Sequence, residues 1–502
     1  MKQILVLGAG KSSTILIEYL LSVAQKIDAH IHVADIDPDA AASKIGSHER
    51  GSASVILDAG PDAFLPKVKD SALVISLLPP PVHLQVAQDC LQAGIHFLNA
   101  SYLTPEIKSM DAAAQTKGLC FLAECGLDPG IDHMSAMRLI DGIKDAGGKI
   151  RSFRSHCGGL LAPVCDNNPW HYKFSWNPRN VIQAGKEGAL YREDNETIQV
   201  PYKQLFDPTR TVKVPGVGEF AWYPNRDSLL YLQRYGLEDI PTFVRTTLRH
   251  PDFCFGWKNL IDLKLTDDGI AYETDGMSLA AFFQIHFDRF GFSDWFEKTL
   301  SVPFRETRSH LEELITLFEA DSARPTEEQH KDDIMLVNRK GDLRTMSVTN
   351  TRSNATQGIA HRMHEAKLAL SQLFFLGLDS GELINQGKMT TSSILQWAME
   401  KRMTLGEQDR DRIVMMHDIA FEQDGKHQQI TSTLSLEGKD RHRTAMAMTV
   451  GLPLAIAAKK ILQGVIKQPG VHIPVHPVFY NAILPELEAL GISFSEEVKE
   501  IE

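Results

Sequence analysis

The sequence predicts an α/β protein in which a parallel-sheet domain is followed by a mixed α/β domain with a mainly helical insertion. Two observations lead to this prediction. Over residues 1–125, short apolar runs alternate with helical stretches, and a glycine turn opens the alternation. After about residue 130, long alternating strands and loops rich in glycine, proline and aromatic residues take over. Strands that alternate with helices at such spacing form a parallel sheet with helices on both faces.

A glycine turn follows the first predicted strand. Ile4–Leu7 is apolar, the turn Gly8–Ser13 comes next, and a helical stretch begins at Ile15. Gly8 allows a tight turn. Gly10 lets the backbone approach a pyrophosphate at the helix N-terminus, where free N–H groups favour an anion. The turn therefore predicts a Rossmann-type dinucleotide site, with contacts from Gly8, Gly10, Lys11 and Ser12.

The second predicted strand ends at Asp35. An acid at this distance from the glycine turn accepts hydrogen bonds from the adenosine ribose. A carboxylate also repels a 2′-phosphate, so we expect NAD as the cofactor and expect NADP to bind less well. The alternative is an ordinary strand–turn–helix without a ligand. A P-loop is not indicated by Lys11-Ser12, because the required glycine spacing is missing.

The other predicted strands of this domain end where ligands of parallel sheets bind, beyond the carboxyl ends. They run over residues 54–57, 72–78, 96–99 and 119–123, with helices at 82–93 and 105–116 between them. Two of these ends add Asp58 and Leu78 to the predicted cofactor contacts.

Composition limits the class of protein. With 502 residues the chain is too long for one core, and 43% hydrophobic with 23% charged residues is typical of a globular protein. A net charge of −12 argues against nucleic acid or an anionic membrane as a partner. No apolar run reaches about 18 residues, and the N-terminus enters a strand directly. Six cysteines without a CxxC pair predict reduced thiols, so we expect a cytoplasmic protein.

Four parts of the chain are predicted. Residues 1–125 form the dinucleotide-binding domain, and 126–275 with 406–445 form the mixed α/β substrate domain. Residues 276–405 form the helical insertion, and 446–502 pack back on the first two domains. Within the substrate domain we expect a strand at 149–156 and a hairpin of 414–421 with 429–436. Within the insertion we expect helices at 309–320 and 359–377 and an exposed connection at 319–333. A helix is expected at 445–463, with a kink or a break at Pro453.

The segment Ala123–Met134 is the most unusual in the chain. Gly126 and Gly130 allow a ligand to approach the backbone, while Pro129 suits the first turn of a helix that Asp128 would cap. The alternatives left open are that Asp128 is only a cap and that His133 is only a packed helix residue.

Several motifs together resemble saccharopine reductase, the glutamate-forming saccharopine dehydrogenase family. They are Glu124–His133, Ser101-Tyr102, Cys157-Gly158-Gly159, Tyr172–Trp176, Tyr223–Ser228, Thr247-Leu248-Arg249, Glu407–His417 and Ala447–Gly464. Residues 260–400 match loosely and carry inserted residues. The order and spacing of the motifs, more than any single one, carry the resemblance.

The resemblance implies an enzyme of lysine metabolism that interconverts saccharopine and water with L-glutamate and 2-aminoadipate 6-semialdehyde, using NAD or NADP. Arginine suits the carboxylates of such a substrate, because its planar fork binds a carboxylate through two hydrogen bonds. The family's substrate contacts fall on Ser101, Tyr102, Asp128, Arg226, Thr247, Leu248 and Arg249. Its further cofactor contacts fall on Asn99, Ala100, Ser101, Leu127, Asp128, Pro129 and Ser175.

The proton-transfer group is left open among Asp128, Tyr102 and Cys157, with His156 and water as further candidates. Two rival functions also stay open: a related C–N adduct reductase such as carboxynorspermidine synthase, and a non-catalytic NAD-binding sensor or scaffold. The expected partner is a small amino-acid substrate, and a homodimer is a candidate assembly. No metal is expected, because the His361/His364 and His472/His476 pairs lack a third ligand.

Overall fold

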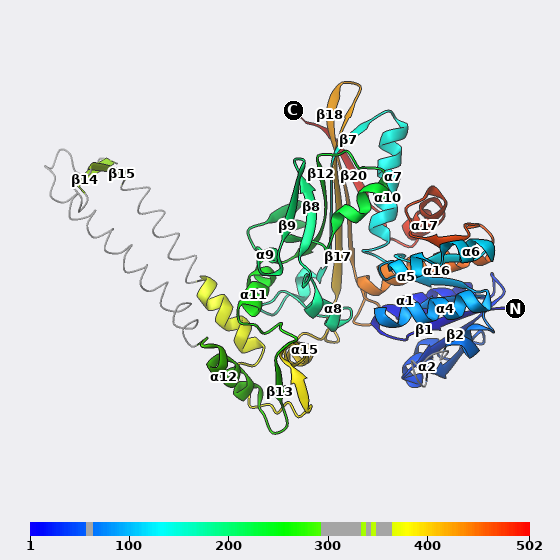
Figure 1. The fold of residues 1–502 in the computed structure, drawn as a ribbon, viewed down its shortest axis with the longest axis horizontal. Helices are drawn as coiled ribbons and strands as arrows, with labels where there is room; N and C mark the ends of the chain where they lie inside the picture. The colour runs from blue at the N-terminus through cyan, green and yellow to red at the C-terminus, as the bar shows by residue number, and fades with distance from the viewer. Residues whose placement is uncertain (57–63, 293–332, 338–342, 348–363, 502) are drawn as a thin grey trace. The chain divides into compact units, whose positions relative to one another are not determined.

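The structure is a computed structural model that describes residues 1–56, 64–292, 333–337, 343–347 and 364–501 (Figure 1). The expected cofactor contact Asp58, the expected helix at 309–320 and His361 lie outside these residues. Contacts divide the chain into two compact units, residues 1–167, 171–254 and 403–502 in the first, and 168–170 with 255–402 in the second. The α/β fold class is confirmed.

The first unit contains a seven-stranded parallel sheet in the order β19-β6-β5-β4-β1-β2-β3. From β3 to β6 this is the strand order of the classic dinucleotide-binding fold. The central strands are apolar and mostly buried, as parallel strands with helices on both faces are, whereas the edge strand β3 is partly exposed. The strands of this sheet are β1 (Lys2–Leu7), β2 (Ala29–Asp35), β3 (Gly51–Val55), β4 (Leu73–Ser76), β5 (His96–Asn99), β6 (Cys120–Leu122) and β19 (Gly470–His472).

Alternate residues of β1 face two different hydrophobic clusters. Ile4 and Val6 pack with helices that include α1 (Thr14–Val23) and α16 (Ala445–Leu462). Leu5 and Leu7 pack with the helices on the other face. Those helices are α3 (Leu65–Val68), α4 (His83–Ala93), α5 (Pro105–Lys108) and α6 (Asp111–Thr116), while α2 (Pro38–Ile45) joins the first cluster.

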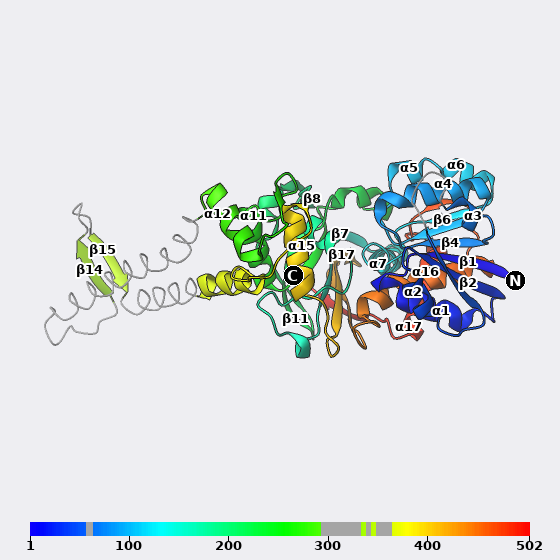
Figure 2. The same cartoon turned by 90° about the horizontal axis from the view of Figure 1, so that it is seen from below.

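The C-terminal part of the chain returns to this sheet. β19 pairs in parallel with β6, and α16 lies beside α1 and α17 (Pro477–Ala489), as Figures 1 and 2 show. Of the kink or break expected at Pro453, the break is wrong, because α16 continues through the proline as one helix, and the kink stays a prediction. By length and composition α16 could cross a membrane, but 78% of it is buried within the structure, as in any central core helix.

The first unit also holds a nine-stranded mixed sheet. Its main path is β10-β11-β12-β7-β17-β18-β20, with β8 and β9 attached to β12, and β12 runs parallel to β7. The hairpin of β17 and β18 turns at Asp424-Gly425, as expected, and both of its strands are longer than predicted. The bounds are β7 (Lys149–Leu161), β8 (Ala189–Glu193), β9 (Glu196–Val200), β10 (Thr211–Val214), β11 (Gly218–Pro224), β12 (Thr242–Arg249), β17 (Asp411–Gln423), β18 (Lys426–Glu437) and β20 (Ser495–Glu500).

One long helix connects the two sheets of the first unit. α7 (Ile131–Asp145) follows β6 and packs on β7, β17 and α17, with Met134, Ile140 and Phe153 in a shared core. This core joins the parallel and mixed sheets, so residues at the start of α7 can meet residues of β12. Short helices complete the unit: α8 (Pro178–Gln183), α9 (Tyr202–Leu205) and α10 (Leu232–Tyr235).

The second unit is less purely helical than expected. Its elements include two two-stranded sheets, β13 (Ala271–Glu273) with β16 (Lys388–Thr390) and β14 (Asp333–Val337) with β15 (Leu343–Ser347). Its helices include most of α11 (Pro251–Asp262), α12 (Leu279–Phe290) and α15 (Thr391–Arg402). The four domain boundaries expected above stay predictions.

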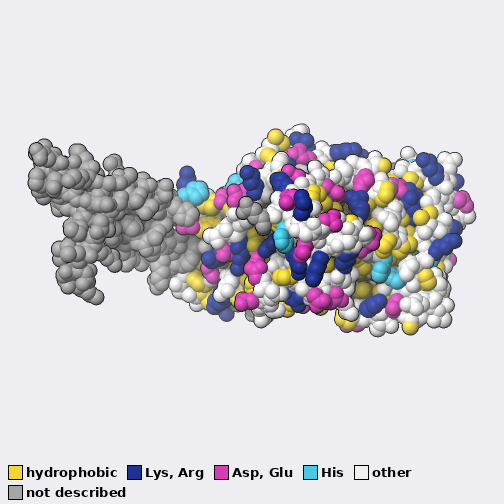
Figure 3. Space-filling model, turned by 90° about the horizontal axis from the view of Figure 1, so that it is seen from above, with side chains coloured by type: hydrophobic (Ala, Val, Ile, Leu, Met, Phe, Trp, Pro, Cys, Tyr) yellow, Lys and Arg dark blue, Asp and Glu magenta, His cyan; other side chains and the backbone are white. Residues whose placement is uncertain are grey.

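Acidic and basic side chains are mixed over the face of the molecule shown in Figure 3. No strip of one sign stands out there.

Candidate active site

The glycine turn has an open face. Gly8 has a φ of 102°, and a Cβ there would lie 3.1 Å from the carbonyl oxygen of Leu77, so a side chain would be strained and crowded. A Cβ at Gly10 would meet nothing within 4 Å. Residues Lys11–Ser13 form a 3₁₀ turn that leads into α1, and Lys11 donates to the carbonyl of Phe174 at 3.4 Å. The open side of Gly10 at a helix start fits an anionic ligand.

The Asp35 carboxylate is bonded to the turn. One oxygen accepts the N–H of Ala9 at 2.5 Å, and the other accepts the N–H of Asp37 at 2.9 Å. The ammonium of Lys44 lies nearby and donates to the carbonyl of Gly10 and the hydroxyl of Ser13. Burial lowers the pKa of Lys44 to about 8, although the charge of Asp35 opposes that shift. Asp35 therefore shapes the turn, and a cation sits on the same turn.

The ends of β4 and β5 are joined by a buried histidine. His83 bonds the hydroxyls of Ser76 and Ser101, each at 2.9 Å, and burial lowers its pKa to about 4, so the ring is neutral at pH 7. Asn99 accepts the N–H of Ser101 at 3.0 Å. Its buried amide nitrogen has no partner among the described residues. Asn99 ends β5 at the same carboxyl edge of the sheet as the glycine turn after β1, so an unpaired buried donor there fits the carbonyl or hydroxyl groups of a bound dinucleotide.

The segment after β6 does not form the helix cap expected from the sequence. α7 begins at Ile131 with Gly130 as its N-cap, so Pro129 precedes the helix and Asp128 does not cap it. Gly126 and Gly130 pack so closely that a Cβ on Gly130 would lie 2.1 Å from the Gly126 carbonyl. Leu127 is buried in this compact turn. The Asp128 carboxylate bonds a side chain from outside the turn.

Those partners are charged groups that sequence reasoning missed. Arg245, 3% exposed, donates to Asp128 at 2.7 Å and to Asp132 at 2.6 Å. The Asp128 side chain is 14% exposed, more than either partner. Burial, with the nearby charge of Asp132, raises the pKa of Asp128 to about 6, while Arg245 lowers it. Asp128 is thus the member of the cluster most open to a ligand, with a pKa near neutrality.

A second group of polar side chains borders Asp128. Asn225 bonds Asp128 and donates to the hydroxyl of Tyr102 at 3.4 Å. The exposed guanidinium of Arg226 lies over the Tyr102 ring, 4.8 Å from its centre, and the backbone of Arg226 is left-handed with a φ of 52°. Burial raises the pKa of Tyr102 far above neutrality, so its hydroxyl keeps its proton. The structure thus brings Tyr102, Asp128 and Arg226 together.

Arg249 is a buried cation. It is 3% exposed, and it donates to two backbone carbonyls, Leu248 at 3.0 Å and Gly159 at 3.4 Å. The central carbon of its guanidinium lies 5.3 Å from the centre of the Tyr172 ring and 5.5 Å from the centre of the Phe253 ring. Its buried Nε atom has no hydrogen-bond partner, and no carboxylate lies within ion-pair distance, in the part of the chain that is described. A buried positive charge without a carboxylate is a strong indication of an anionic ligand.

The remaining predicted contacts have different surroundings. Cys157 is buried, and burial raises the pKa of its thiol well above the usual value, so it is not an activated nucleophile. The hydroxyl of Thr247 bonds Tyr223. The side chain of Leu248 lies in a small hydrophobic cluster, which leaves only its backbone for a ligand. Ser175 donates to Asp411, whose carboxylate also accepts the first N–H groups of α16.

His133 has polar partners on both sides. Its ring bonds the carboxylate of Glu124 at 2.8 Å and the hydroxyl of Tyr235 at 2.6 Å, and Tyr231 also donates to Glu124 at 2.9 Å. All of these side chains are buried. The network fixes the start of α7 against α10, and through Asp132 it reaches the cluster of Arg245.

A signal for Arg245 was present in the sequence. Arg245, Thr247 and Arg249 alternate along one strand, and a strand places every second side chain on the same face. The bond to Asp128 itself could not be read from the sequence, because it joins a strand of the mixed sheet to the turn between β6 and α7.

Together, the open glycine turn, the Rossmann sheet and the buried cations beside an acid define a dinucleotide-binding oxidoreductase of the α/β class. The chain matches two family models, the saccharopine dehydrogenase NADP binding domain over residues 4–122 and the saccharopine dehydrogenase C-terminal domain over 126–492. The chain belongs to the saccharopine dehydrogenase family.

Similar proteins cover nearly the whole chain. Saccharopine dehydrogenase [NADP(+), L-glutamate-forming] of Schizosaccharomyces pombe is 29% identical over 99% of both chains, and that of Saccharomyces cerevisiae is 31% identical over 89% of both. The structure of the apo saccharopine dehydrogenase (L-Glu forming) from Saccharomyces cerevisiae matches with a TM-score of 0.76 and 27% identity, covering 99% of this chain and 100% of the other. The chain spans 45% of the alpha-aminoadipic semialdehyde synthase of Arabidopsis thaliana, at 29% identity.

One expectation is corrected by these matches. A preference for NAD over NADP was inferred from Asp35 and is wrong, because the matching domain family is NADP-binding and the fungal relatives are named for NADP(+). The structure supplies a physical reason. Both carboxylate oxygens of Asp35 accept hydrogen bonds from backbone N–H groups, those of Ala9 and Asp37. An aspartate at this position therefore stabilises the turn and does not by itself indicate NAD.

Proposed function

We propose that the chain is an NADP-dependent saccharopine dehydrogenase of the L-glutamate-forming type. It would interconvert saccharopine and water with L-glutamate and 2-aminoadipate 6-semialdehyde. The observation that carries the proposal is the buried guanidinium of Arg249, whose Nε atom has no hydrogen-bond partner among the described residues. Burying a charge costs several kcal/mol unless a partner offsets it, and a substrate carboxylate is such a partner.

Substrate binding is assigned to two arginines. Arg249 would bind one carboxylate, and its buried position makes that contact selective for a planar anion. Arg226 would bind another from a more exposed position, with its guanidinium oriented by the ring of Tyr102. Saccharopine carries three carboxylates, so two fixed cations at separate positions hold it in one orientation.

Proton transfer is assigned to Asp128. A carboxyl group with a pKa of about 6 accepts and releases a proton near neutral pH. Arg245 holds one oxygen of Asp128, and Asn225 bonds the same carboxyl group, which limits its orientation. Tyr102 borders the site as a protonated hydroxyl and can donate a hydrogen bond. Cys157 keeps its proton and is given no chemical step.

The dinucleotide would be held by the glycine turn at Gly8 and Gly10, by Lys44 and by the unpaired amide of Asn99. When bound, it supplies the hydride acceptor or donor for the carbon next to the bridging nitrogen. The protein's own part is to orient that carbon, to hold the carboxylates and to move the proton. A cytoplasmic location, a homodimer and the absence of nucleic-acid and membrane partners stay predictions.

The test is direct. The purified chain is mixed with saccharopine and NADP+, and in parallel with NAD+, and the absorbance of reduced nicotinamide is followed while glutamate is measured as the product. The expected result is reduction with equimolar glutamate, faster with NADP+. No reduction with either cofactor, while the chain still binds dinucleotide, would favour a non-catalytic binding protein and overturn the proposal.

A further inference from the structure

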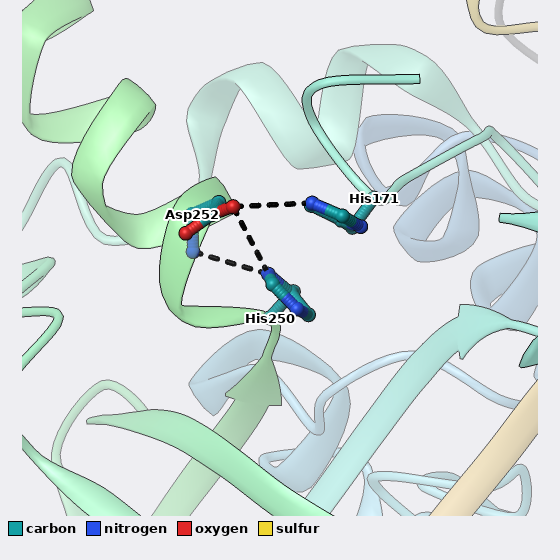
Figure 4. Close-up of side chains that lie close together, drawn as sticks. All are labelled: His171, His250 and Asp252. Atoms are coloured by element: carbon teal, nitrogen blue, oxygen red, sulfur yellow. Dashed lines mark hydrogen bonds and ion pairs between the residues drawn. The ribbon is translucent and has the colours of Figure 1, made fainter. Parts of the chain in front are cut away.

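Two histidines and an aspartate meet at the junction of β12 and α11. His250 and Asp252 flank the proline that begins α11, and His171 comes from the loop before α8. The Asp252 carboxylate lies 3.1 Å from Nε2 of His171 and 3.9 Å from Nδ1 of His250. Figure 4 shows how these three side chains face one another. One donor atom from each of the three residues lies within 4.8 Å of the others. We propose that this triad binds a divalent cation of the zinc class.

The donor atoms are close to the spacing that zinc needs. Bonds of about 2.0–2.1 Å to nitrogen and oxygen in a tetrahedral site place neighbouring ligand atoms about 3.3 Å apart. The measured 3.1 and 3.9 Å bracket this value, and the three donor atoms all lie within 4.8 Å of one another. All three side chains are partly exposed, which gives an ion a path from solvent.

The hydrogen bonds favour the protonation states that a metal requires. Nδ1 of His250 accepts the backbone N–H of Asp252 at 3.2 Å, so that nitrogen is unprotonated, and an ion bound there would replace this hydrogen bond. Nδ1 of His171 lies 2.6 Å from the carboxylate of Asp166, which directs Nε2 of the same ring toward Asp252. A carboxylate on the outer nitrogen of a metal-binding histidine is the arrangement that fixes its orientation in zinc sites.

Two carboxylates lie at the triad. Asp166 and Asp252 lie 2.6 and 3.1 Å from the two ring nitrogens of His171. The rings of His171 and His250 are stacked with centres 3.7 Å apart. Nitrogen and carboxylate donors in this number are typical of zinc.

The site would stabilise a segment next to Arg249. His171 precedes Tyr172, whose ring lies beside the guanidinium of Arg249, and His250 follows Arg249 directly. His171 has a left-handed backbone with a φ of 49°, a conformation that costs free energy in a residue other than glycine. A bound cation would hold this loop against the end of β12, and the role assigned to it is structural.

The test uses the intact, tag-free chain without substrate or cofactor, so its outcome is independent of the proposed reaction. The chain is freed of metal with a chelator and titrated with zinc chloride in a calorimeter. We expect one ion per chain. His171→Ala and His250→Ala should each weaken binding at least about 10-fold, and Asp166→Asn, which keeps every donor atom, about 10-fold. His427→Ala, which removes an exposed histidine from β18, is the matched control and should bind as the unchanged chain does.

Cobalt chloride provides a second readout, because a tetrahedral cobalt site absorbs visible light strongly and reports nitrogen and oxygen donors. Circular dichroism identifies any variant that fails to fold, and Asp166→Asn then carries the test. Failure of the unchanged chain to bind zinc would show that His171 is simply an imidazolium between two carboxylates, and the proposal would be overturned. Binding that survives in His171→Ala and His250→Ala would place the ion elsewhere and would also overturn it.

Discussion

The guanidinium of Arg245 lies 2.7 Å from the carboxylate of Asp128, although 117 residues separate them in the sequence. Arg245 belongs to the mixed sheet, and Asp128 follows the last core strand of the Rossmann sheet. The contact therefore joins the predicted substrate residues to the dinucleotide side of the same unit. It also lowers the pKa of a carboxyl group that burial would otherwise raise further.

Removing the buried cation should damage substrate binding. In Arg249→Ala we expect kcat/KM for saccharopine to fall about 10²- to 10³-fold, mainly through KM, because loss of one partner of a buried charge pair costs about 2–5 kcal/mol. Steady-state kinetics checks this. The control is Arg151→Ala, which removes a surface guanidinium paired with Glu422. Near-normal saturation in Arg249→Ala would refute the carboxylate contact.

The proton-transfer assignment predicts a pH dependence. The Asp128 carboxylate accepts a proton only when ionised, so the rate of saccharopine oxidation should rise with pH through its pKa of about 6. In Asp128→Asn we expect kcat to fall about 10²- to 10⁴-fold and this inflection to disappear. Asp418→Asn, a partly buried acid that bonds Gln429 on the same sheet, is the control. An inflection that persists in Asp128→Asn would assign it to another group.

Arg245 should act through Asp128. Because the charge of Arg245 lowers the pKa of Asp128, Arg245→Met should move the inflection of the rate profile to higher pH. Arg245→Ala should reduce the free energy of unfolding by about 3–5 kcal/mol, since it leaves two buried carboxylates without their cation. Urea titration measures the second effect. A lower stability with an unmoved inflection would mean that Arg245 is structural only.

Asp35 offers a test of the corrected cofactor assignment. Its carboxylate accepts N–H groups from Ala9 and Asp37, so Asp35→Ala should loosen the turn and weaken NADP+ and NAD+ alike, about 10-fold. Asp39→Ala, an exposed acid in the first turn of α2, is the control. Dissociation constants for NADP+ and NAD+ from titration calorimetry check both variants. A large gain in NADP+ affinity alone would restore charge repulsion as the main role of Asp35.

Buried neutral histidines should make the fold sensitive to acid. Burial lowers the pKa of His83 to about 4, of His156 to about 3 and of His417 to about 4. The unfolded chain binds these protons below about pH 6.5 and the folded chain does not, so stability is lost as the pH falls. The urea midpoint should decline steadily between about pH 7 and pH 5. In His417→Gln the decline should be smaller, whereas the exposed His427→Gln should match the unchanged chain.

Local pattern was sufficient for much of the fold. The strand at His96–Asn99 was predicted to the residue, and the hairpin through Asp424-Gly425 was found, because each depends on residues adjacent in sequence. The helix was not broken at Pro453, contrary to one half of the expectation of a kink or a break. Neighbouring elements bury 78% of α16, and this packing outweighs the hydrogen bond that proline cannot make.

The sequence alone determined the family, the glycine turn and the choice of Arg249 on β12 as a candidate substrate contact, because motif order and turn chemistry are local properties. Only the tertiary structure decided that Asp128 pairs with Arg245, that Asp35 bonds the turn, and that Arg249 is buried without a carboxylate in the described chain. Charge partners depend on which strands and helices pack together. A pKa, a desolvation cost and a ligand preference therefore appear only once distant segments have met.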